Sequence, residues 1–171
     1  PFVLLEVGDA RVRPCVRRDM TSWVHDALAR VGRAGGFIDN RPRGVRCLHP
    51  IVTALEKLDA IMRRWHRVPF EPASFVRHYE DIGHIVSQLS AMPLPPGFTD
   101  ASAVMATMKI ALDHEHPAWT PDEDIERWRS LRAAHLAIGP MFWGKRMSLE
   151  DACRVMSDWI VALNRPAAAP D

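Results

Sequence analysis

Two charged side chains lie off the apolar stripes of neighbouring predicted helices, where they can meet in a shared cleft. At about 100° of rotation per helical residue, Lys57 lies roughly 120° from the centre of its stripe, with Arg64 two turns further along the same edge. Asp81 lies roughly 120° from the stripe of the next helix, with Arg77 one turn earlier. Glu6 is a third candidate, because it is an acid within an otherwise apolar strand and points away from any covered sheet face.

Residues of these types suit phosphoryl or nucleotidyl transfer. Carboxylates hold Mg²⁺, and lysine or arginine neutralises the charge that develops as pyrophosphate leaves a triphosphate. The alternative is that the charged residues around Lys57 form a solvated helix face and that Asp81 pairs with Arg77 on a helix surface. Spacing alone leaves both interpretations open.

The first 48 residues are predicted to be mixed α/β structure. Strands are expected over Phe2–Val7, over Arg11–Arg17 with an interruption at Pro14, and over Val45–Leu48. Between them, Thr21 or Ser22 can cap a short helix that runs to Arg30. Because the chain opens on an apolar run, we expect it to be a fragment that lacks an N-terminal part; the alternative is removal of an initiator methionine before Pro1.

From Pro50 onward the pattern is helical. Pro50 suits the first turn of a helix, because a backbone N–H at that position has no hydrogen-bond acceptor within the helix. Apolar residues then recur at spacings of four and three and form one stripe: Ile51, Leu55, Leu58, Met62 and Trp65. After Pro69 and Pro72, the same pattern is repeated by Phe75, Tyr79, Ile82, Val86 and Leu89. Two helices with matched stripes and a short connection are expected to pack as an antiparallel pair.

Three further helices carry start signals in the sequence. The expected helices and their caps are Ala101–Leu112 after Asp100, Ile125–Ala137 after Thr120 and Pro121, and Ala152–Leu163 after Ser148. We therefore predict an α+β chain in which residues 1–48 form the edge of a sheet and residues 49–165 form a mainly α-helical bundle. Residues 166–171 are expected to be a frayed tail.

Composition limits the possible functions. The 171 residues carry 22 lysines and arginines against 21 aspartates and glutamates, a formal net charge of +1. This balance excludes a strongly basic nucleic-acid wrapper but allows a local basic patch. Six arginines could form such a patch and bind an RNA phosphate backbone: Arg41, Arg43, Arg46, Arg63, Arg64 and Arg67. The alternative is that they are scattered, solvated arginines. No apolar run approaches the roughly 20 residues that span a bilayer, so no membrane partner is expected.

The cysteines and histidines give no metal or disulfide pattern. Cys15, Cys47 and Cys153 lie far apart and form no C-x-x-C pair, so we interpret them as packing residues of a protein in the reducing cytoplasm. The segment His114–His116 lacks the H-E-x-x-H spacing of a zinc site and is followed by a proline. We expect it to be a loop.

Two motifs in the sequence resemble the AbiEii-type nucleotidyltransferase toxins. The first is a hydrophobic strand and a proline that lead into Thr-x-x-Glu-Lys-Leu, here Thr53–Leu58. The second, at about the family's distance, is an Arg-His/Asp-Tyr-x-Asp helix, here Arg77–Asp81. The run Leu4–Gly8 is similar to the family's apolar strand that ends in an acid and a small residue, and the helices up to Asn164 are similar to its bundle. The resemblance covers nearly the whole chain.

The resemblance implies transfer of NMP from an NTP to an acceptor, with Mg²⁺ as cofactor and RNA such as tRNA as the expected acceptor. It also implies a toxin role in a bacterial type IV toxin–antitoxin or phage-defence system, with a cognate antitoxin that acts on the toxin gene. Lys57, with Arg64 and Arg77, would contact the triphosphate. Asp81 would position Lys57 or act on the acceptor hydroxyl, and Glu6 would be a metal-binding or acceptor-orienting carboxylate.

The chain departs from the family at one motif. Family members carry an upstream Gly-Ser followed by a D-x-D or E-x-D pair, and this sequence contains no Gly-Ser dipeptide. Its D-x-D, Asp122–Asp124, is typical of a helix cap. Residues 1–48 are therefore expected to be an incomplete C-terminal part of a nucleotidyltransferase core, inactive without the missing motif. The alternative function is a non-catalytic helical module that binds a partner protein or RNA.

Overall fold

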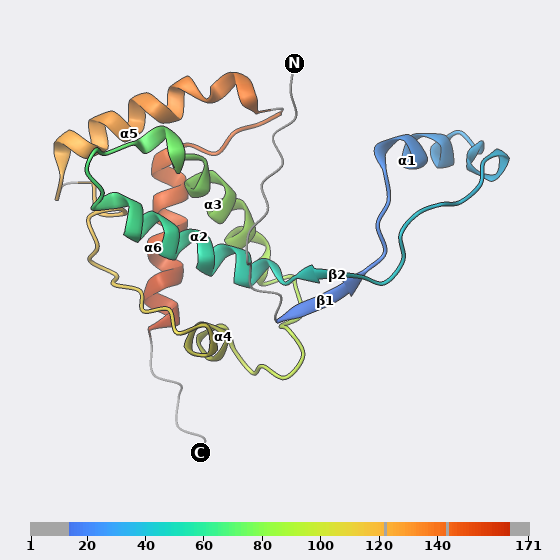
Figure 1. The fold of residues 1–171 in the computed structure, drawn as a ribbon, viewed down its shortest axis with the longest axis horizontal. Coiled ribbons are helices and arrows are strands. Elements are labelled where there is room, and N and C mark those ends of the chain that lie inside the picture. Colours follow the sequence, from blue (N-terminus) through green and yellow to red (C-terminus); the bar gives the residue numbers. More distant parts are fainter. Residues whose placement is uncertain (1–13, 122, 143, 165–171) are drawn as a thin grey trace. The chain divides into compact units, whose positions relative to one another are not determined.

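The protein is described from a computed structural model, which covers residues 14–121, 123–142 and 144–164 (Figure 1). These residues form a mostly helical structure with one small sheet, which confirms the predicted α+β class. The chain divides into two compact units, Pro1–His49 and Pro50–Asp171. The strand predicted over Phe2–Val7, with Glu6 in it, lies outside the described residues.

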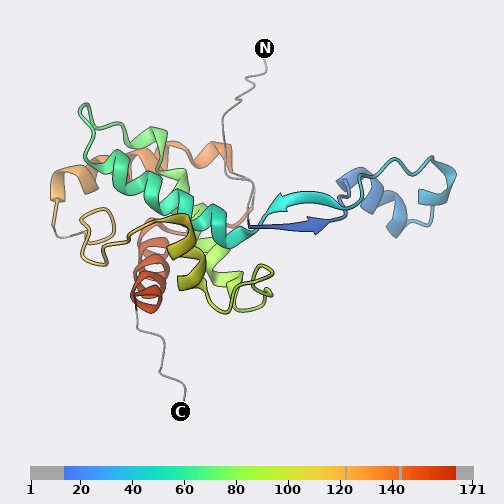
Figure 2. The same cartoon turned by 60° about the horizontal axis from the view of Figure 1, so that its bottom comes forward.

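The first unit is a hairpin with a helical insertion. Strands β1 (Cys15–Arg18) and β2 (Val45–Leu48) pair antiparallel, as Figure 2 shows. Between them lie helix α1 (Trp23–Arg30) and the short 3-10 helix η1 (Ala34–Gly36). Of the two predicted caps of α1, Ser22 is the one used: its side chain accepts a hydrogen bond from the His25 N–H.

The strand register separates two cysteines. Cys15 lies opposite Leu48, and Cys47 lies opposite Val16. Since paired residues share a face and successive residues alternate between faces, the two thiols lie on opposite sides of the hairpin. Both are free, as is Cys153, which is buried in the second unit and has a raised thiol pKa because of that burial.

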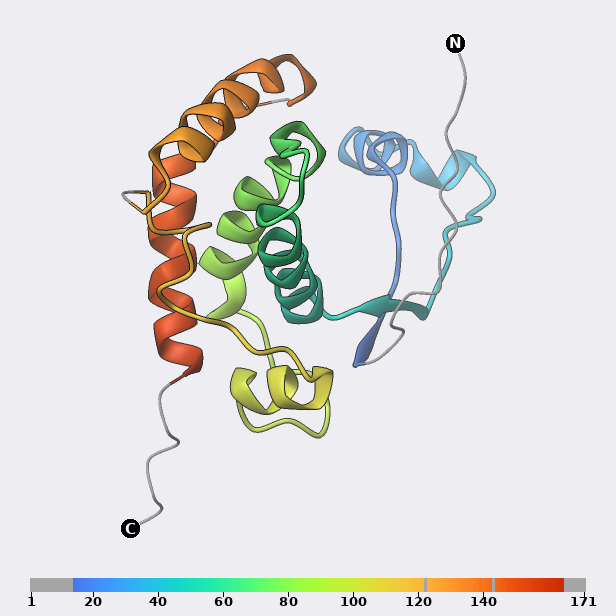
Figure 3. The same cartoon turned by 60° about the vertical axis from the view of Figure 1, so that its left-hand side comes forward.

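Three helices form the centre of the second unit. Helix α3 (Arg77–Leu89) packs against both α2 (Pro50–Trp65) and α6 (Leu149–Leu163), and Figure 3 shows the three side by side. The predicted stripe of α2 is confirmed, because four of its five members are fully buried and Met62 is half-buried. The predicted packing of the first helix pair is confirmed by the contacts between α2 and α3.

The remaining elements of this unit are shorter. They are η2 (Pro72–Ser74), α4 (Ala101–Met108), α5 (Ile125–Ala137) and η3 (Gly139–Met141). Among the described residues, no helix is both long and apolar enough to cross a membrane.

Two helix boundaries and one helix cap differ from the sequence predictions. Helix α4 ends at Met108 instead of Leu112, because Lys109 adopts a left-handed conformation with φ 56° and closes the helix. Helix α5 has the predicted bounds, Ile125–Ala137, but it is capped by Asp124 and not by Thr120. Helix α6 begins at Leu149, directly after its cap, instead of at Ala152. The predicted caps Asp100 and Ser148 are confirmed.

Candidate functional site

Lys57 and Asp81 meet across the interface of α2 and α3. The distance from Lys57 Nζ to Asp81 Oδ2 is 2.8 Å, so the predicted convergence of these side chains is confirmed. Their side chains are 23% and 39% exposed. The pair therefore lies at the edge of the core, with solvent access, as the off-stripe positions of both residues predict.

His78 is a third member of this cluster, and it was not among the predicted site residues. Lys57 Nζ lies 3.2 Å from His78 Nδ1, and Arg64 Nη1 lies 3.4 Å from His78 Nε2. Burial and the positive charges of Lys57 and Arg64 lower the pKa of His78 from 6.5 to about 4. The ring is consequently neutral at pH 7 and can accept a hydrogen bond from the ammonium group.

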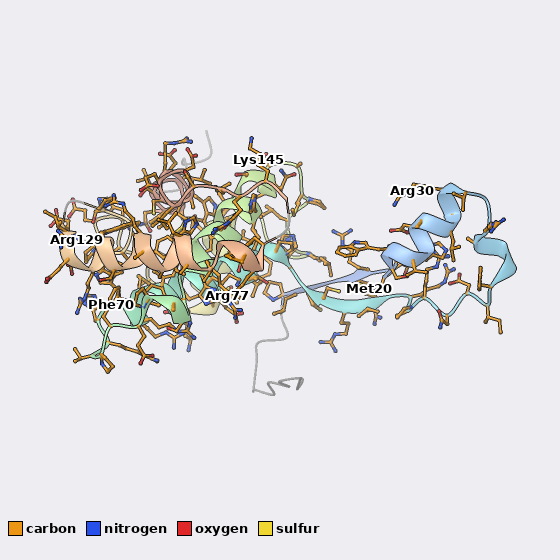
Figure 4. All side chains as sticks on the ribbon, turned by 90° about the horizontal axis from the view of Figure 1, so that it is seen from above. Met20, Arg30, Phe70, Arg77, Arg129 and Lys145 are labelled. Carbon is orange, nitrogen blue, oxygen red and sulfur yellow. The ribbon has the colours of Figure 1, made fainter. Side chains whose placement is uncertain are left out.

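The two predicted arginines occupy different places. Arg64 Nη1 donates a hydrogen bond of 2.8 Å to the backbone carbonyl of Ser74, so its guanidinium braces the connection between α2 and α3. Arg77, labelled in Figure 4, is the first residue of α3 and is exposed. It lines the same cavity as Lys57 and Asp81, whereas Arg64 contacts the backbone of one of the lining residues.

A cavity of about 530 Å³ opens beside the Lys57–Asp81 pair. Its size falls within the range of about 300–1,000 Å³ that is usual for small-ligand sites. The lining residues come from α2, from the start of α3 and its preceding turn, and from the segment after α5: Lys57, Ala73, Ser74, Arg77, Asp81, Ile138, Met141 and Phe142. Three of the five predicted site residues, Lys57, Arg77 and Asp81, therefore line this cavity.

A buried ion pair holds the segment that follows η3. Glu80 is 2% exposed and accepts hydrogen bonds from Arg146 Nη2 at 2.8 Å, Arg146 Nε at 3.1 Å and the Met147 N–H at 2.8 Å. Burial alone would raise the pKa of Glu80, but these hydrogen bonds outweigh it and lower that pKa. No local sequence pattern predicts this pair, since its partners are 66 residues apart.

The described residues do not form a magnesium site. Of the described carboxylates, Asp81 alone lines the cavity, and it is engaged by the Lys57 ammonium. No group of three or more histidine, cysteine, aspartate or glutamate side chains within the described ranges is placed to hold a metal ion. A single paired carboxylate does not fit Mg²⁺, which takes oxygen ligands in octahedral geometry. The expected metal role of Glu6 concerns a residue outside the described ranges.

The His114–His116 segment is a loop, as predicted. His116 Nε2 lies 3.0 Å from His66 Nε2, and His116 Nδ1 accepts a hydrogen bond from the Ala118 N–H. With Nδ1 acting as an acceptor, the proton of the neutral His116 ring is on Nε2, where it faces the second ring. This contact ties the end of α2 to the loop.

The candidate RNA-binding arginines do not share one environment. Arg41 and Arg43 both bind the carboxylate of Asp39, and Arg63 pairs with Asp59 on the surface of α2. Arg41, Arg43 and Arg46 belong to the first unit, and Arg63, Arg64 and Arg67 belong to the second. In comparisons with known proteins, no family model, curated protein or solved structure matches this chain.

Proposed function

We propose that this chain supplies the phosphate-binding part of a nucleotidyltransferase of the AbiEii-toxin type, which transfers NMP from an NTP to an RNA acceptor. The observation that supports this proposal most strongly is the Lys57 ammonium, which is held by Asp81 and His78 at the edge of a cavity that Arg77 also lines. In this proposal the β1–β2 hairpin is the edge of a nucleotidyltransferase-type sheet.

Lys57 has the hydrogen-bonding capacity to bind a phosphate. An ammonium group carries three N–H donors. Asp81 and His78 each lie within hydrogen-bonding distance of Nζ, which leaves one donor for a ligand. Arg77 adds a second positive charge at the same cavity. Together the two cations would neutralise the charge that develops on the pyrophosphate as the acceptor oxygen bonds to the α-phosphorus.

Asp81 has two possible roles in this proposal. The 2.8 Å contact with Lys57 supports the positioning role over action on the acceptor hydroxyl. His78 shares that role, because its neutral ring accepts a hydrogen bond without adding charge. Mg²⁺ is the cofactor of the proposed reaction, but the described residues include no set of ligands that would hold it.

Calorimetric titration with ATP tests the proposal. We expect wild-type protein to bind ATP and Lys57→Ala to bind it at least tenfold more weakly, because a charged hydrogen bond contributes about 1.5–3 kcal/mol. Arg129→Ala is the matched control: Arg129, labelled in Figure 4, is an exposed cation on α5 that does not line the cavity. Equal ATP affinity of Lys57→Ala and wild type would contradict the proposal.

The cellular role follows from the same resemblance. We propose a cytoplasmic toxin of a type IV toxin–antitoxin or phage-defence system, whose antitoxin acts on the toxin gene. Incubation of this chain with labelled NTPs, Mg²⁺ and total tRNA is expected to label no RNA, because the sequence lacks the Gly-Ser motif. Strong labelling would contradict the assignment of that motif to the metal-binding step.

The first unit favours a second candidate function, RNA binding without catalysis. Residues 14–49 contain seven arginines and three aspartates, an excess of four positive charges. Helix α1 buries no residue, and Trp23 and Phe37 are 88% and 64% exposed. A basic surface with exposed aromatic rings is typical of single-stranded nucleic-acid binding.

Fluorescence anisotropy with a single-stranded RNA oligonucleotide tests this candidate in the absence of NTP. We expect binding that weakens with salt and that is lost in the triple variant of Arg18, Arg33 and Arg46 to alanine, while Arg129→Ala binds like wild type. Equal binding by the triple variant and wild type would exclude residues 14–49 as the RNA-binding surface.

A further inference from the structure

The cavity beside Lys57 is lined by two chemically different groups of residues. Lys57, Arg77 and Asp81 are charged and lie on α2 and α3. Ile138, Met141 and Phe142 are apolar and come from the segment that follows α5. A bare phosphate or a metal ion needs no such apolar wall, whereas a nucleotide joins a charged tail to a flat aromatic base.

The apolar wall is fixed to α3 by the buried ion pair. The Arg146 guanidinium carbon lies 4.5 Å from the centre of the Phe142 ring, a cation–π distance. The same guanidinium donates to Glu80 Oε2 and, at 3.2 Å, to the His135 carbonyl. Since Glu80 directly precedes Asp81 on α3, one helix both contributes Asp81 to the cavity and holds the apolar segment in place.

We propose that Phe142 is the platform of a nucleobase subsite, on which the base of a nucleoside triphosphate stacks while its phosphates reach Lys57 and Arg77. This inference rests on the proposed function and extends it to the base. The contact of Arg146 with the Phe142 ring orients that ring, and the ring also lines the cavity. Arg146 is thus a positioning residue for the subsite.

The chemistry of the wall also sets the expected specificity. Phenylalanine has no hydrogen-bonding group, so it recognises the face of a base and not its edge. Stacking of this kind tolerates every base, and a larger ring system gains more contact. We therefore expect the subsite to bind purine nucleotides somewhat more tightly than pyrimidine nucleotides, without rejecting either.

Paired titrations with ATP and inorganic tripolyphosphate test the subsite. Tripolyphosphate has the charged tail and no base, so Phe142→Ala is expected to weaken ATP binding about tenfold and to leave tripolyphosphate binding unchanged. Phe142→Leu keeps apolar volume but removes the aromatic face, and it is expected to show the same selective loss with an unchanged melting temperature. Phe142→Trp is expected to bind ATP at least as tightly as wild type.

The outcomes separate this inference from the proposed function. If Phe142→Ala and Phe142→Leu bind ATP like wild type, or if they lose ATP and tripolyphosphate binding equally, the nucleobase subsite is wrong and the phosphate site stands. If Lys57→Ala leaves the binding of both ligands unchanged, the proposed function fails. If wild type binds neither ligand, both proposals fail together.

Discussion

Two ion pairs start from neighbouring residues of α3 and have opposite surroundings. Glu80 is 2% exposed and accepts three hydrogen bonds from the segment around Arg146. The Asp81 side chain is 39% exposed and meets Lys57 beside a cavity. Because successive helical residues point about 100° apart, adjacent acids can serve different neighbours. The comparison indicates that a saturated, buried carboxylate holds structure, whereas a paired carboxylate with solvent access leaves its partner able to bind a ligand.

Removal of Glu80 is expected to have the largest effect on stability. Glu80→Ala leaves the Arg146 guanidinium without its carboxylate and the Met147 N–H without an acceptor. Loss of one partner of a buried pair costs about 3–5 kcal/mol of unfolding free energy. Because the Arg146 side chain is 23% exposed, we expect a loss at the lower end of that range. Urea denaturation measures this loss. The control is Glu150→Ala, which breaks an exposed ion pair with Arg132 and is expected to cost less than about 1 kcal/mol. Equal midpoints for the two variants would contradict a structural role of Glu80.

The stability of the protein is expected to depend on pH through His78. Folding lowers the pKa of this ring from 6.5 to about 4, so between these values the unfolded chain binds a proton that the folded chain does not. The stabilisation is therefore present above pH 6.5 and falls, by a few kcal/mol, as the pH decreases to about 4.

His78→Asn tests that dependence, because asparagine keeps an acceptor near the position of Nδ1 and does not titrate. We expect a shallower loss of unfolding free energy across the same pH window, measured by urea denaturation at several pH values. His114→Asn, which changes an exposed loop histidine, is the matched control. An unchanged acid dependence in His78→Asn would show that other groups cause it.

The close approach of α3 to the loop before α6 depends on Gly83. A Cβ built at this position overlaps Met147 Sδ and touches Ala152. Gly83 lies one turn after Glu80, so the same approach lets the Met147 N–H reach the Glu80 carboxylate. Gly83→Ala is expected to cost about 1–3 kcal/mol in thermal or urea unfolding. The control is Gly35→Ala, where a Cβ meets no atom within 4 Å, and a similar cost in both variants would refute the packing argument.

Removal of Asp81 is expected to have the smallest effect on stability. Asp81→Ala breaks a partly exposed ion pair, and such pairs contribute about 0–1 kcal/mol. Urea denaturation midpoints of Asp81→Ala and Glu80→Ala, measured under the same conditions, compare the two effects directly. If Asp81→Ala loses as much unfolding free energy as Glu80→Ala, both carboxylates stabilise the fold and the contrast between them is wrong.

Local sequence patterns predicted much of this fold and part of the site. The stripe of α2 and the caps Ser22, Asp100 and Ser148 depend on residues within one or two turns, so they are visible in the sequence. The meeting of Lys57 with Asp81 follows from helical periodicity on two adjacent helices.

The features that escaped prediction depend on distant partners. Arg146 reaches Glu80 across 66 residues, and Phe142 lines a cavity together with residues of α2 and α3. No local pattern identifies either contact. The end of α4 at Lys109 escaped prediction because a left-handed lysine is uncommon and carries no sequence signal.

The central claim is that Lys57 binds phosphate and does not support the fold, and thermal melts with and without tripolyphosphate test it most directly. A ligand that binds the folded state raises the melting temperature. Lys57→Met is expected to melt like wild type without ligand and to show no rise with tripolyphosphate. Leu58→Ala, which truncates a fully buried neighbour, is expected to lose about 2–5 kcal/mol of stability and to keep the rise. A full rise in Lys57→Met, or an early melt of that variant without ligand, would contradict the account.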